Sequence, residues 1–163
     1  MLPTIYGIVR NWAGGCVATD EKAGSVAAGT TFNHTADCAI EFVINTIPSS
    51  NSINLNVRIQ DSSNYWTIRN YSNGKLILWE VVAGGFTQRA SKSSAVSGGE
   101  RIVVIANDEI ISVYYDGALA FSYSSAANFK TETNGELEAL GIGGTVSDII
   151  SWPLPCGLVE VGL

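Results

Sequence analysis

The chain has 163 residues, of which 46% are hydrophobic and 15% are charged, and its formal net charge is −6. This length and apolar content allow one domain to bury a core without disulfide or metal support. The acidic balance and the singly scattered basic residues exclude binding by phosphate neutralisation, so we expect neither nucleic acid nor a membrane as a partner.

Short runs of Ile, Val and Tyr between stretches of Gly, Ser, Thr and Asn predict an all-β chain of strands and turns. The first strands are expected near residues 4–10, 25–32 and 37–45. Residues 53–60 then alternate strictly between apolar and polar side chains. This alternation predicts a strand with one buried and one solvated face.

A series of hairpins is predicted from residue 53 to residue 93. Residues 61–64 have turn chemistry and precede a strand over residues 65–71. Asn73-Gly74 is typical of a two-residue type I′ turn, because that turn needs positive φ at both central positions. The returning strand over residues 75–82 would then direct three large apolar residues to the core, namely Ile77, Trp79 and Val81.

A second set of hairpins is predicted over residues 101–106, 109–115 and 118–124, with a turn at Asp116-Gly117. Here the alternation fails, because residues 102–105 are all apolar. Both faces of these strands are therefore expected to be shielded from water, by a segment laid across them or by another subunit. We accordingly predict a homo-oligomer.

The last two strands are expected near residues 136–142 and 147–152, so that residues 1–152 form a single domain. Pro153 and Pro155 interrupt the pattern, and residues 153–163 form an apolar tail. This tail either closes an edge of its own sandwich or adds a strand to a neighbouring molecule. Both alternatives stay open.

Three segments resemble the concanavalin A-like lectin and glucanase superfamily, especially the laminin G-like domains of phage and bacterial surface proteins. They are residues 57–66 (VRIQDSSNYW), 74–82 (GKLILWEVV) and 111–119 (ISVYYDGAL), and their order and spacing also match. The resemblance implies a two-sheet antiparallel jelly-roll sandwich in which one sheet is concave. Members of the superfamily bind glycans, bind proteins, hydrolyse glucans or serve as structural modules.

Catalysis is not expected, and no catalytic residue is assigned. The hydrolytic relatives use a Glu-x-Asp-x-x-Glu motif, and the most similar string here, Glu136-Leu137-Glu138, has no third acid and indicates a solvated strand face. His34 is the only histidine, so a nucleophile–histidine arrangement would depend on it alone, and no Gly-x-Ser-x-Gly elbow is present. We interpret His34 as a loop residue.

No cofactor is predicted. Laminin G-like relatives often hold a calcium ion, for which Asp20 and Asp61 are the candidate donors. No loop here has the alternating acidic ligands of a strong calcium motif, so a structural calcium ion stays an open alternative. The wide spacing of Cys16, Cys38 and Cys156 suits neither a metal knuckle nor a dense disulfide framework, which favours three small buried thiols.

A candidate carbohydrate-binding surface is the polar face of the strands at 53–60 and 65–71. Amides and a guanidinium offer directional hydrogen bonds to sugar hydroxyls, and tyrosine rings offer flat stacking surfaces. The alternative is an ordinary solvated sheet face, in which Arg69 pairs with Glu80 across the hairpin. The candidate residues are Asn54, Asn56, Arg58, Gln60, Tyr65, Arg69 and Tyr71.

These observations suggest a non-enzymatic structural or decorating protein on the surface of a phage virion, with other virion proteins as partners. The chain opens Met1-Leu2-Pro3-Thr4 without a basic segment leading into an apolar run, so synthesis in the host cytoplasm is expected. The alternative is a stand-alone carbohydrate-binding adhesion module for cell-surface glycans, on a virion or on a bacterial cell surface. A glucan hydrolase is the third reading, which the missing motif disfavours.

Overall fold

The computed structural model describes residues 4–5, 17–92, 96–154 and 160–161. These residues form strands and turns, and none of them belongs to a helix, so the described part of the chain has no helix that could cross a membrane. The strands are β1 Thr4–Ile5, β2 Asp20–Val26, β3 Thr30–Asn33, β4 Cys38–Thr46, β5 Ser52–Asp61, β6 Asn64–Tyr71, β7 Leu76–Val82, β8 Gly85–Lys92, β9 Glu100–Asn107, β10 Ile110–Tyr115, β11 Ala118–Tyr123, β12 Asn134–Ala139, β13 Thr145–Pro153 and β14 Glu160–Val161.

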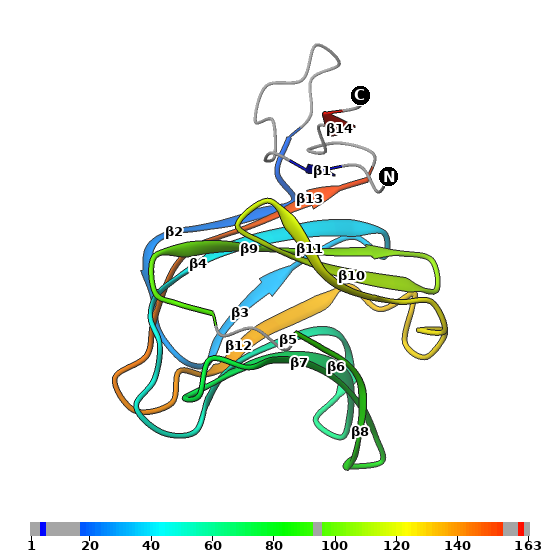
Figure 1. The fold of residues 1–163 in the computed structure, drawn as a ribbon. Coiled ribbons are helices and arrows are strands. Elements are labelled where there is room, and N and C mark those ends of the chain that lie inside the picture. The colour runs from blue at the N-terminus through cyan, green and yellow to red at the C-terminus, as the bar shows by residue number, and fades with distance from the viewer. Residues whose placement is uncertain (1–3, 6–16, 93–95, 155–159, 162–163) are drawn as a thin grey trace.

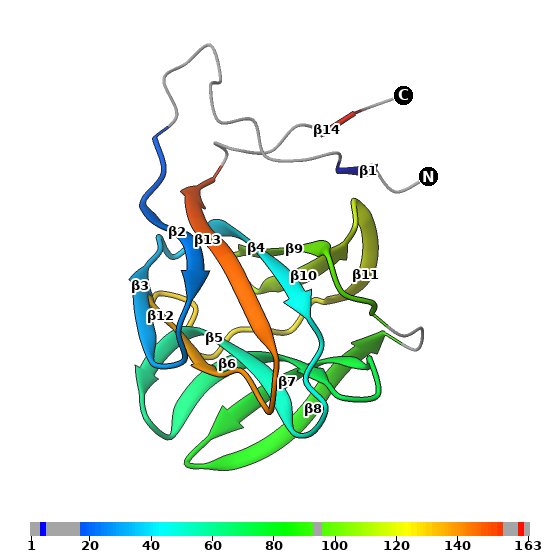
Figure 2. The same cartoon turned by 90° about the vertical axis from the view of Figure 1, so that its left-hand side faces the viewer.

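Two six-stranded antiparallel sheets pack face to face (Figures 1 and 2). Sheet I has the strand order β11-β10-β9-β4-β13-β2, and sheet II has the order β3-β12-β5-β6-β7-β8. A separate two-stranded sheet pairs β1 with β14 and lies beyond sheet I (Figure 1). This arrangement confirms the predicted all-β, two-sheet antiparallel sandwich.

The main hydrophobic core lies between the two sheets, because alternate side chains of each strand point inward. In sheet I the inward residues of β9 are Ile102, Val104 and Ala106, each at most 1% exposed. In sheet II, Trp66 of β6 is fully buried, and its Nε1 donates to the carbonyl of Asn128 at 2.8 Å. The indole therefore fills the core without leaving its N–H unpaired.

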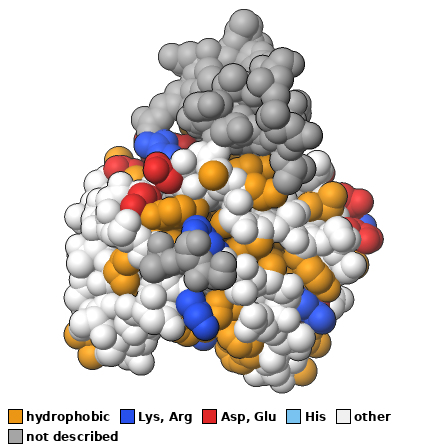
Figure 3. Space-filling model, viewed as in Figure 1, with side chains coloured by type: hydrophobic (Ala, Val, Ile, Leu, Met, Phe, Trp, Pro, Cys, Tyr) orange, Lys and Arg blue, Asp and Glu red, His pale blue; other side chains and the backbone are white. Residues whose placement is uncertain are grey.

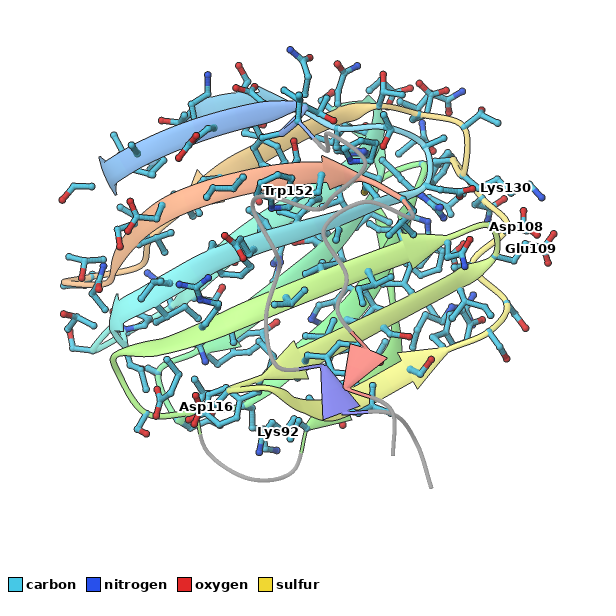
Figure 4. All side chains as sticks on the ribbon, turned by 90° about the horizontal axis from the view of Figure 1, so that it is seen from above. Lys92, Asp108, Glu109, Asp116, Lys130 and Trp152 are labelled. Atoms are coloured by element: carbon cyan, nitrogen blue, oxygen red, sulfur yellow. The ribbon has the colours of Figure 1, made fainter. Side chains whose placement is uncertain are left out.

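The outer face of sheet I is also apolar and buried, as the unbroken run at residues 102–105 predicts. A second cluster on this face consists of Ala39, Val103, Ile105, Ile150 and Trp152, against which Ala18, Tyr114 and Leu154 pack. Figure 4 shows Trp152 on this side of the sandwich. The burial of this cluster within one copy of the chain removes the need for a second subunit to cover it, and the predicted oligomer stays a prediction.

Several strand bounds differ from the expected ones. The single strand expected over residues 25–32 is divided between β2 in sheet I and β3 in sheet II, and Gly29 with a φ of 88° lies in the turn between them. Of the strand expected over residues 4–10, β1 covers Thr4–Ile5, and residues 6–10 lie outside the described residues. In the tail, Glu160–Val161 pairs with β1 of the same chain.

The hairpin between β6 and β7 has a different register from the expected one. Asn70 pairs with Leu76, and the connection between the two strands comprises residues 72–75 instead of Asn73-Gly74 alone. Because a shift of one residue moves every side chain to the other face of the strand, the expected inward set is wrong. Leu76 and Leu78 lie in the core, and Ile77, Trp79 and Val81 lie on the outer face of sheet II.

A bulge in β5, between Val57 and Asp61, is not visible in the strict alternation of residues 53–60. At this bulge Arg58 has a φ of 49°, in the left-handed region. The bulge turns the Arg58 side chain away from the solvated face, and Arg58 is 0% exposed. Its predicted place among the surface binding residues is therefore wrong.

Candidate functional site

Sheet II has a second face that is directed away from sheet I, on the side opposite β1 and β14 (Figures 1 and 2). In Figure 1, strands β6, β7 and β8 form an arch that opens on this side. Strand alternation and the cross-strand registers define the outward residues. We call this surface the candidate face, and its members are Glu136 and Glu138 of β12, Asn54 and Asn56 of β5, Tyr65, Thr67, Arg69 and Tyr71 of β6, Ile77, Trp79 and Val81 of β7, and Phe86 and Gln88 of β8.

A polar network crosses the candidate face from β12 to β6. Glu138 Oε2 accepts a hydrogen bond from Asn54 Nδ2 at 3.2 Å and lies 3.7 Å from Arg69 Nη2. The Asn54 side-chain oxygen accepts in turn from the hydroxyl of Ser52 at 2.6 Å. Arg69 thus pairs with Glu138, and the predicted pair with Glu80 is wrong, because Glu80 points inward and binds Arg89.

Aromatic side chains form the other side of the candidate face. Trp79 Nε1 donates to the hydroxyl of Tyr71 at 2.9 Å, and the indole meets the Phe86 ring edge-on at 6.2 Å with an interplanar angle of 81°. The Arg69 guanidinium carbon lies 4.7 Å from the centroid of the Phe86 ring. Phe86 is 48% exposed, so a flat apolar surface remains available to solvent beside the polar network.

Two buried polar atoms on neighbouring strands of the candidate face have no hydrogen-bond partner. Asn56 is 3% exposed and Thr67 is 0% exposed, and the two are direct cross-strand partners. Asn56 Oδ1 and Thr67 Oγ1 are both unpaired, and so is Nε of Arg69 farther along β6. Each unpaired buried polar group costs about 1–3 kcal/mol, and an entering hydroxyl group or water molecule would satisfy it.

Tyr65 lies on the same face with 6% exposure. Burial raises the pKa of the Tyr65 hydroxyl, and the negative charge of Glu138 acts in the same direction. The phenol is therefore protonated at neutral pH and remains a hydrogen-bond donor. It adds a hydroxyl group to a surface whose unpaired atoms are an amide oxygen, a second hydroxyl and the Nε of Arg69.

The structure brings together five of the seven predicted binding residues on the candidate face. Arg58 is excluded because it is buried at the bulge, and Gln60 is an exposed residue at the end of the same bulge. The five that share the face are Asn54, Asn56, Tyr65, Arg69 and Tyr71.

Residue patterns alone missed eight of the thirteen members of the face, among them Trp79, Phe86 and Glu138. The pattern predicts Trp79 in the core because it indicates a two-residue turn before β7, where the structure has a longer one. Phe86 lies one hairpin beyond the two strands whose polar face forms the predicted surface. Glu138 was recognised as a solvated strand carboxylate, but its link to Asn54 depends on the pairing of β12 with β5. No sequence signal reveals that pairing, because the two strands are about 80 residues apart.

Arg58 has a structural role in the interior. Its Nη1 donates to the carbonyl of Asp108 at 2.8 Å and its Nη2 to the carbonyl of Ala36 at 3.0 Å. The carboxylate of Asp37 lies 3.8 Å away. The guanidinium therefore connects the loop before β4 to the turn between β9 and β10, and its one unpaired donor, Nε, is buried away from the surface.

His34 lies in the loop between β3 and β4, as predicted, and is 2% exposed. Its Nδ1 lies 2.8 Å from the carbonyl of Thr35, and its Nε2 lies 3.1 Å from both the backbone N–H of Arg58 and the carbonyl of Asn134. In the neutral ring with the proton on Nδ1, Nδ1 donates to Thr35 and Nε2 accepts from Arg58. Burial raises the pKa of the neighbouring Cys38 thiol to about 12. Because the imidazole is neutral and the thiol keeps its proton, this pair of side chains does not provide an activated nucleophile.

The two candidate calcium donors lie in different sheets. Asp20, in β2, accepts backbone hydrogen bonds from Glu21 and Asn33. Asp61, at the end of β5, accepts from the Ser63 backbone and from the Asn64 amide. Within the described ranges, no group of three or more His, Cys, Asp or Glu side chains is placed to hold a metal ion.

One predicted buried thiol lies within the described residues. Cys38 is a free, buried thiol, whereas Cys16 and Cys156 lie outside the described residues.

Charged side chains are dispersed on the surface that Figure 3 shows. On the side of the molecule in Figure 3, basic side chains occur as small separate groups among polar and apolar ones. At one end of the sandwich, Lys130 binds Asp108 and Glu109 at 2.9 and 3.2 Å (Figure 4).

No protein-family model matches the sequence, and no curated protein matches it. Solved structures do match. The Caenorhabditis elegans galectin LEC-6 aligns with a TM-score of 0.65 and 12% identity, over 84% of this chain and 99% of that chain. The CBM40 of the Ruminococcus gnavus IT-sialidase, bound to α2,3 sialyllactose, aligns with a TM-score of 0.57 and 10% identity, over 83% and 92%.

A fructosyltransferase from A. japonicus also aligns, with a TM-score of 0.56 and 12% identity, but this chain covers only 27% of it. Together with the strand order, these similarities assign the chain to the lectin-like β-sandwiches of concanavalin A-like jelly-roll fold. The assignment confirms the fold that the resemblance found in the sequence implies. It concerns the fold, since identities of 12% or less do not carry a function.

Proposed function

We propose that the chain is a non-enzymatic carbohydrate-binding module and that sugars bind on the candidate face of sheet II. The observation that carries this proposal is the pair of unpartnered, buried atoms Asn56 Oδ1 and Thr67 Oγ1 on adjacent strands. Sugars combine hydroxyl groups, which satisfy such atoms, with apolar ring faces that pack on aromatic side chains. The candidate face supplies both kinds of contact within a few residues.

Two similarities support the proposal at the level of fold. The matched structures include a protein named as a galectin and a carbohydrate-binding module bound to sialyllactose. The fructosyltransferase similarity carries less weight for an enzymatic function, because this chain corresponds to only 27% of that protein. Absence of hydrolysis in this chain stays a prediction, tested by reducing-sugar release with Glu136→Gln and Glu138→Gln as controls.

The decisive experiment replaces Thr67 by Val, which has almost the same shape and lacks the hydroxyl. If Thr67 Oγ1 serves a ligand, Thr67→Val should weaken glycan binding by about tenfold, the effect of about 1.4 kcal/mol. Stability should be unchanged or slightly higher, because an unpaired buried polar group has been removed. Binding is measured on a glycan array and by calorimetry, and stability by urea denaturation.

The matched control is Thr145→Val, an exposed threonine at the start of β13 in sheet I. It should leave both binding and stability unchanged. A loss of stability in Thr67→Val, with no change in binding, would show that the hydroxyl serves the fold alone. The absence of binding to every member of a broad glycan array would contradict the proposal itself.

A place on the surface of a virion or of a bacterial cell stays a prediction, as do partners other than glycans. The apolar strands that motivated the virion hypothesis are buried within one copy of the chain, which removes one reason for it. Sedimentation analysis at high protein concentration tests for an oligomer. Genes for capsid or tail proteins beside the coding sequence would favour the virion over the cell surface.

A further inference from the structure

The candidate face carries more negative than positive charge. Glu136 and Glu138 project from β12, and Arg69 is the one basic side chain directed outward from strands β12 and β5 to β8. The other basic residues of these described strands point inward or toward the edge shared with sheet I. Arg58 donates to the carbonyl of Asp108, Arg89 pairs with Glu80, and Lys92 lies over the ring of Tyr115. Lys75 lies in the exposed turn beyond the strands.

The Arg69 side chain contacts residues on both sides of its own strand. It projects from β6, but it contacts Glu138 on β12 at 3.7 Å and the Phe86 ring on β8 at 4.7 Å. Each of these strands is two positions away from β6 in the sheet. The guanidinium therefore extends across the candidate face, where its side chain is only 18% exposed.

This engagement determines which charges a ligand meets. A ligand carboxylate approaching Arg69 would have to compete with Glu138 and would lie within a few ångströms of that like charge. Displacing Glu138 would also break its hydrogen bond from Asn54. A neutral ligand meets no such penalty, because its hydroxyl groups can donate to Asn56 Oδ1 and accept from Nε of Arg69.

We infer that the candidate face binds neutral sugars and discriminates against sugars that carry a carboxylate, an inference that rests on the proposed function. Arg69 acts as an internal counter-ion for Glu138 and is withheld from anionic ligands. The expected ligand class therefore differs from the sialylated sugar in the similar R. gnavus structure. Discrimination should be about tenfold or more at low salt and should shrink as salt screens the charges.

The test uses an array that pairs neutral glycans with sialylated and uronic acid-containing counterparts, followed by calorimetry on the strongest pair. Binding to neutral members, with acidic counterparts at least about tenfold weaker, supports the inference. Equal or stronger binding of the acidic members overturns it and leaves the proposed function intact. No binding to any member contradicts the proposed function as well.

The diagnostic variant is Glu138→Gln, which keeps the shape of the side chain and removes its charge. It frees Arg69 for an external carboxylate, so the preference for neutral over acidic glycans should fall by about tenfold. The control Glu109→Gln removes a similarly exposed carboxylate, which pairs with Lys130 away from the candidate face, and should leave the preference unchanged. An unchanged preference in both Glu138→Gln and Glu136→Gln would refute the electrostatic account.

Discussion

The Arg58 side chain lies where residue alternation predicts a surface group, yet it is completely buried. The cause is a single backbone conformation, the φ of 49° at the bulge of β5. Residue identity contains no sign of this angle, because arginine is not a residue that favours positive φ. The neighbouring Asn54 and Asn56 precede the bulge and therefore keep their predicted outward direction.

A prediction at the residue scale concerns His34. Burial lowers the pKa of His34 from its ordinary value of 6.5, and the nearby Arg58 charge acts in the same direction. The unfolded chain therefore binds the proton more tightly than the folded chain does. The stability contributed by neutral His34 is complete above about pH 6.5 and is lost as the pH falls from there toward the folded pKa.

The coupling between His34 protonation and stability can be measured with the variant His34→Gln. In this variant a neutral amide oxygen can still accept the Arg58 N–H. The free energy of unfolding of the natural sequence should fall between pH 7 and pH 5 more steeply than that of the variant, by up to about 1.4 kcal/mol per pH unit. Urea denaturation at a series of pH values gives both slopes. Equal slopes would mean that His34 does not take up a proton on unfolding in this range.

At the scale of elements, the β6–β7 hairpin allows a direct test of register. Leu78 is 0% exposed in the core, whereas the adjacent Ile77 is partly exposed on the candidate face. Leu78→Ala should lower the free energy of unfolding by about 2–5 kcal/mol, and Ile77→Ala by about 1 kcal/mol or less. Chemical denaturation of the two variants distinguishes this register from the one-residue alternative, which predicts the reverse order.

Sequence patterns located most strands because local signals sufficed for them. Strict alternation marked β5, and the Asp116-Gly117 turn joined β10 to β11 with the expected positive φ values of 49° and 80°. The failures at Arg58 and Trp79 share one physical origin. A bulge or a longer turn changes side-chain direction by backbone geometry, which residue periodicity does not encode.

The candidate site was predictable only in part for a related reason. Its β5 and β6 residues are neighbours in a single hairpin, so local reasoning placed them together. Glu138 and Phe86 reach the same surface from β12 and β8, whose positions depend on the pairing of distant strands. Such non-local pairing has no signature in a single sequence beyond the resemblance to a known fold.

On the scale of the whole molecule, an ion pair between the buried Glu80 and the partly exposed Arg89 connects the two sheets at one side of the sandwich. Glu80 is 4% exposed, and its Oε2 accepts from Arg89 Nη2 at 2.6 Å while its Oε1 accepts from Asn128 at 2.6 Å. The Arg89 guanidinium carbon lies 5.6 Å from the centroid of the Tyr123 ring of β11. Strand β8 of sheet II is thereby linked to the edge strand of sheet I.

Arg89→Met should therefore destabilise the protein by about 2 kcal/mol, because it leaves the buried Glu80 charge without its counter-ion. Amide hydrogen exchange in β8 and β11 should become faster, and urea denaturation measures the loss in the free energy of unfolding. The double variant Arg89→Met/Glu80→Gln should recover most of the loss, since the neutral amide can still accept from Asn128. Failure of the second substitution to restore stability would assign the effect to lost packing of the arginine stem instead.

The position of β1 and β14 has a consequence for how the protein can be displayed. Both strands lie beyond sheet I, and the candidate face is on the opposite side of the sandwich. Copies tethered to a common support through either of these strands would all present their candidate faces outward, where the proposed function places the sugar contacts. Weak single contacts would then act together, and avidity could exceed the single-site affinity by about 10²–10⁴-fold where the spacing of the copies matches that of the surface sugars.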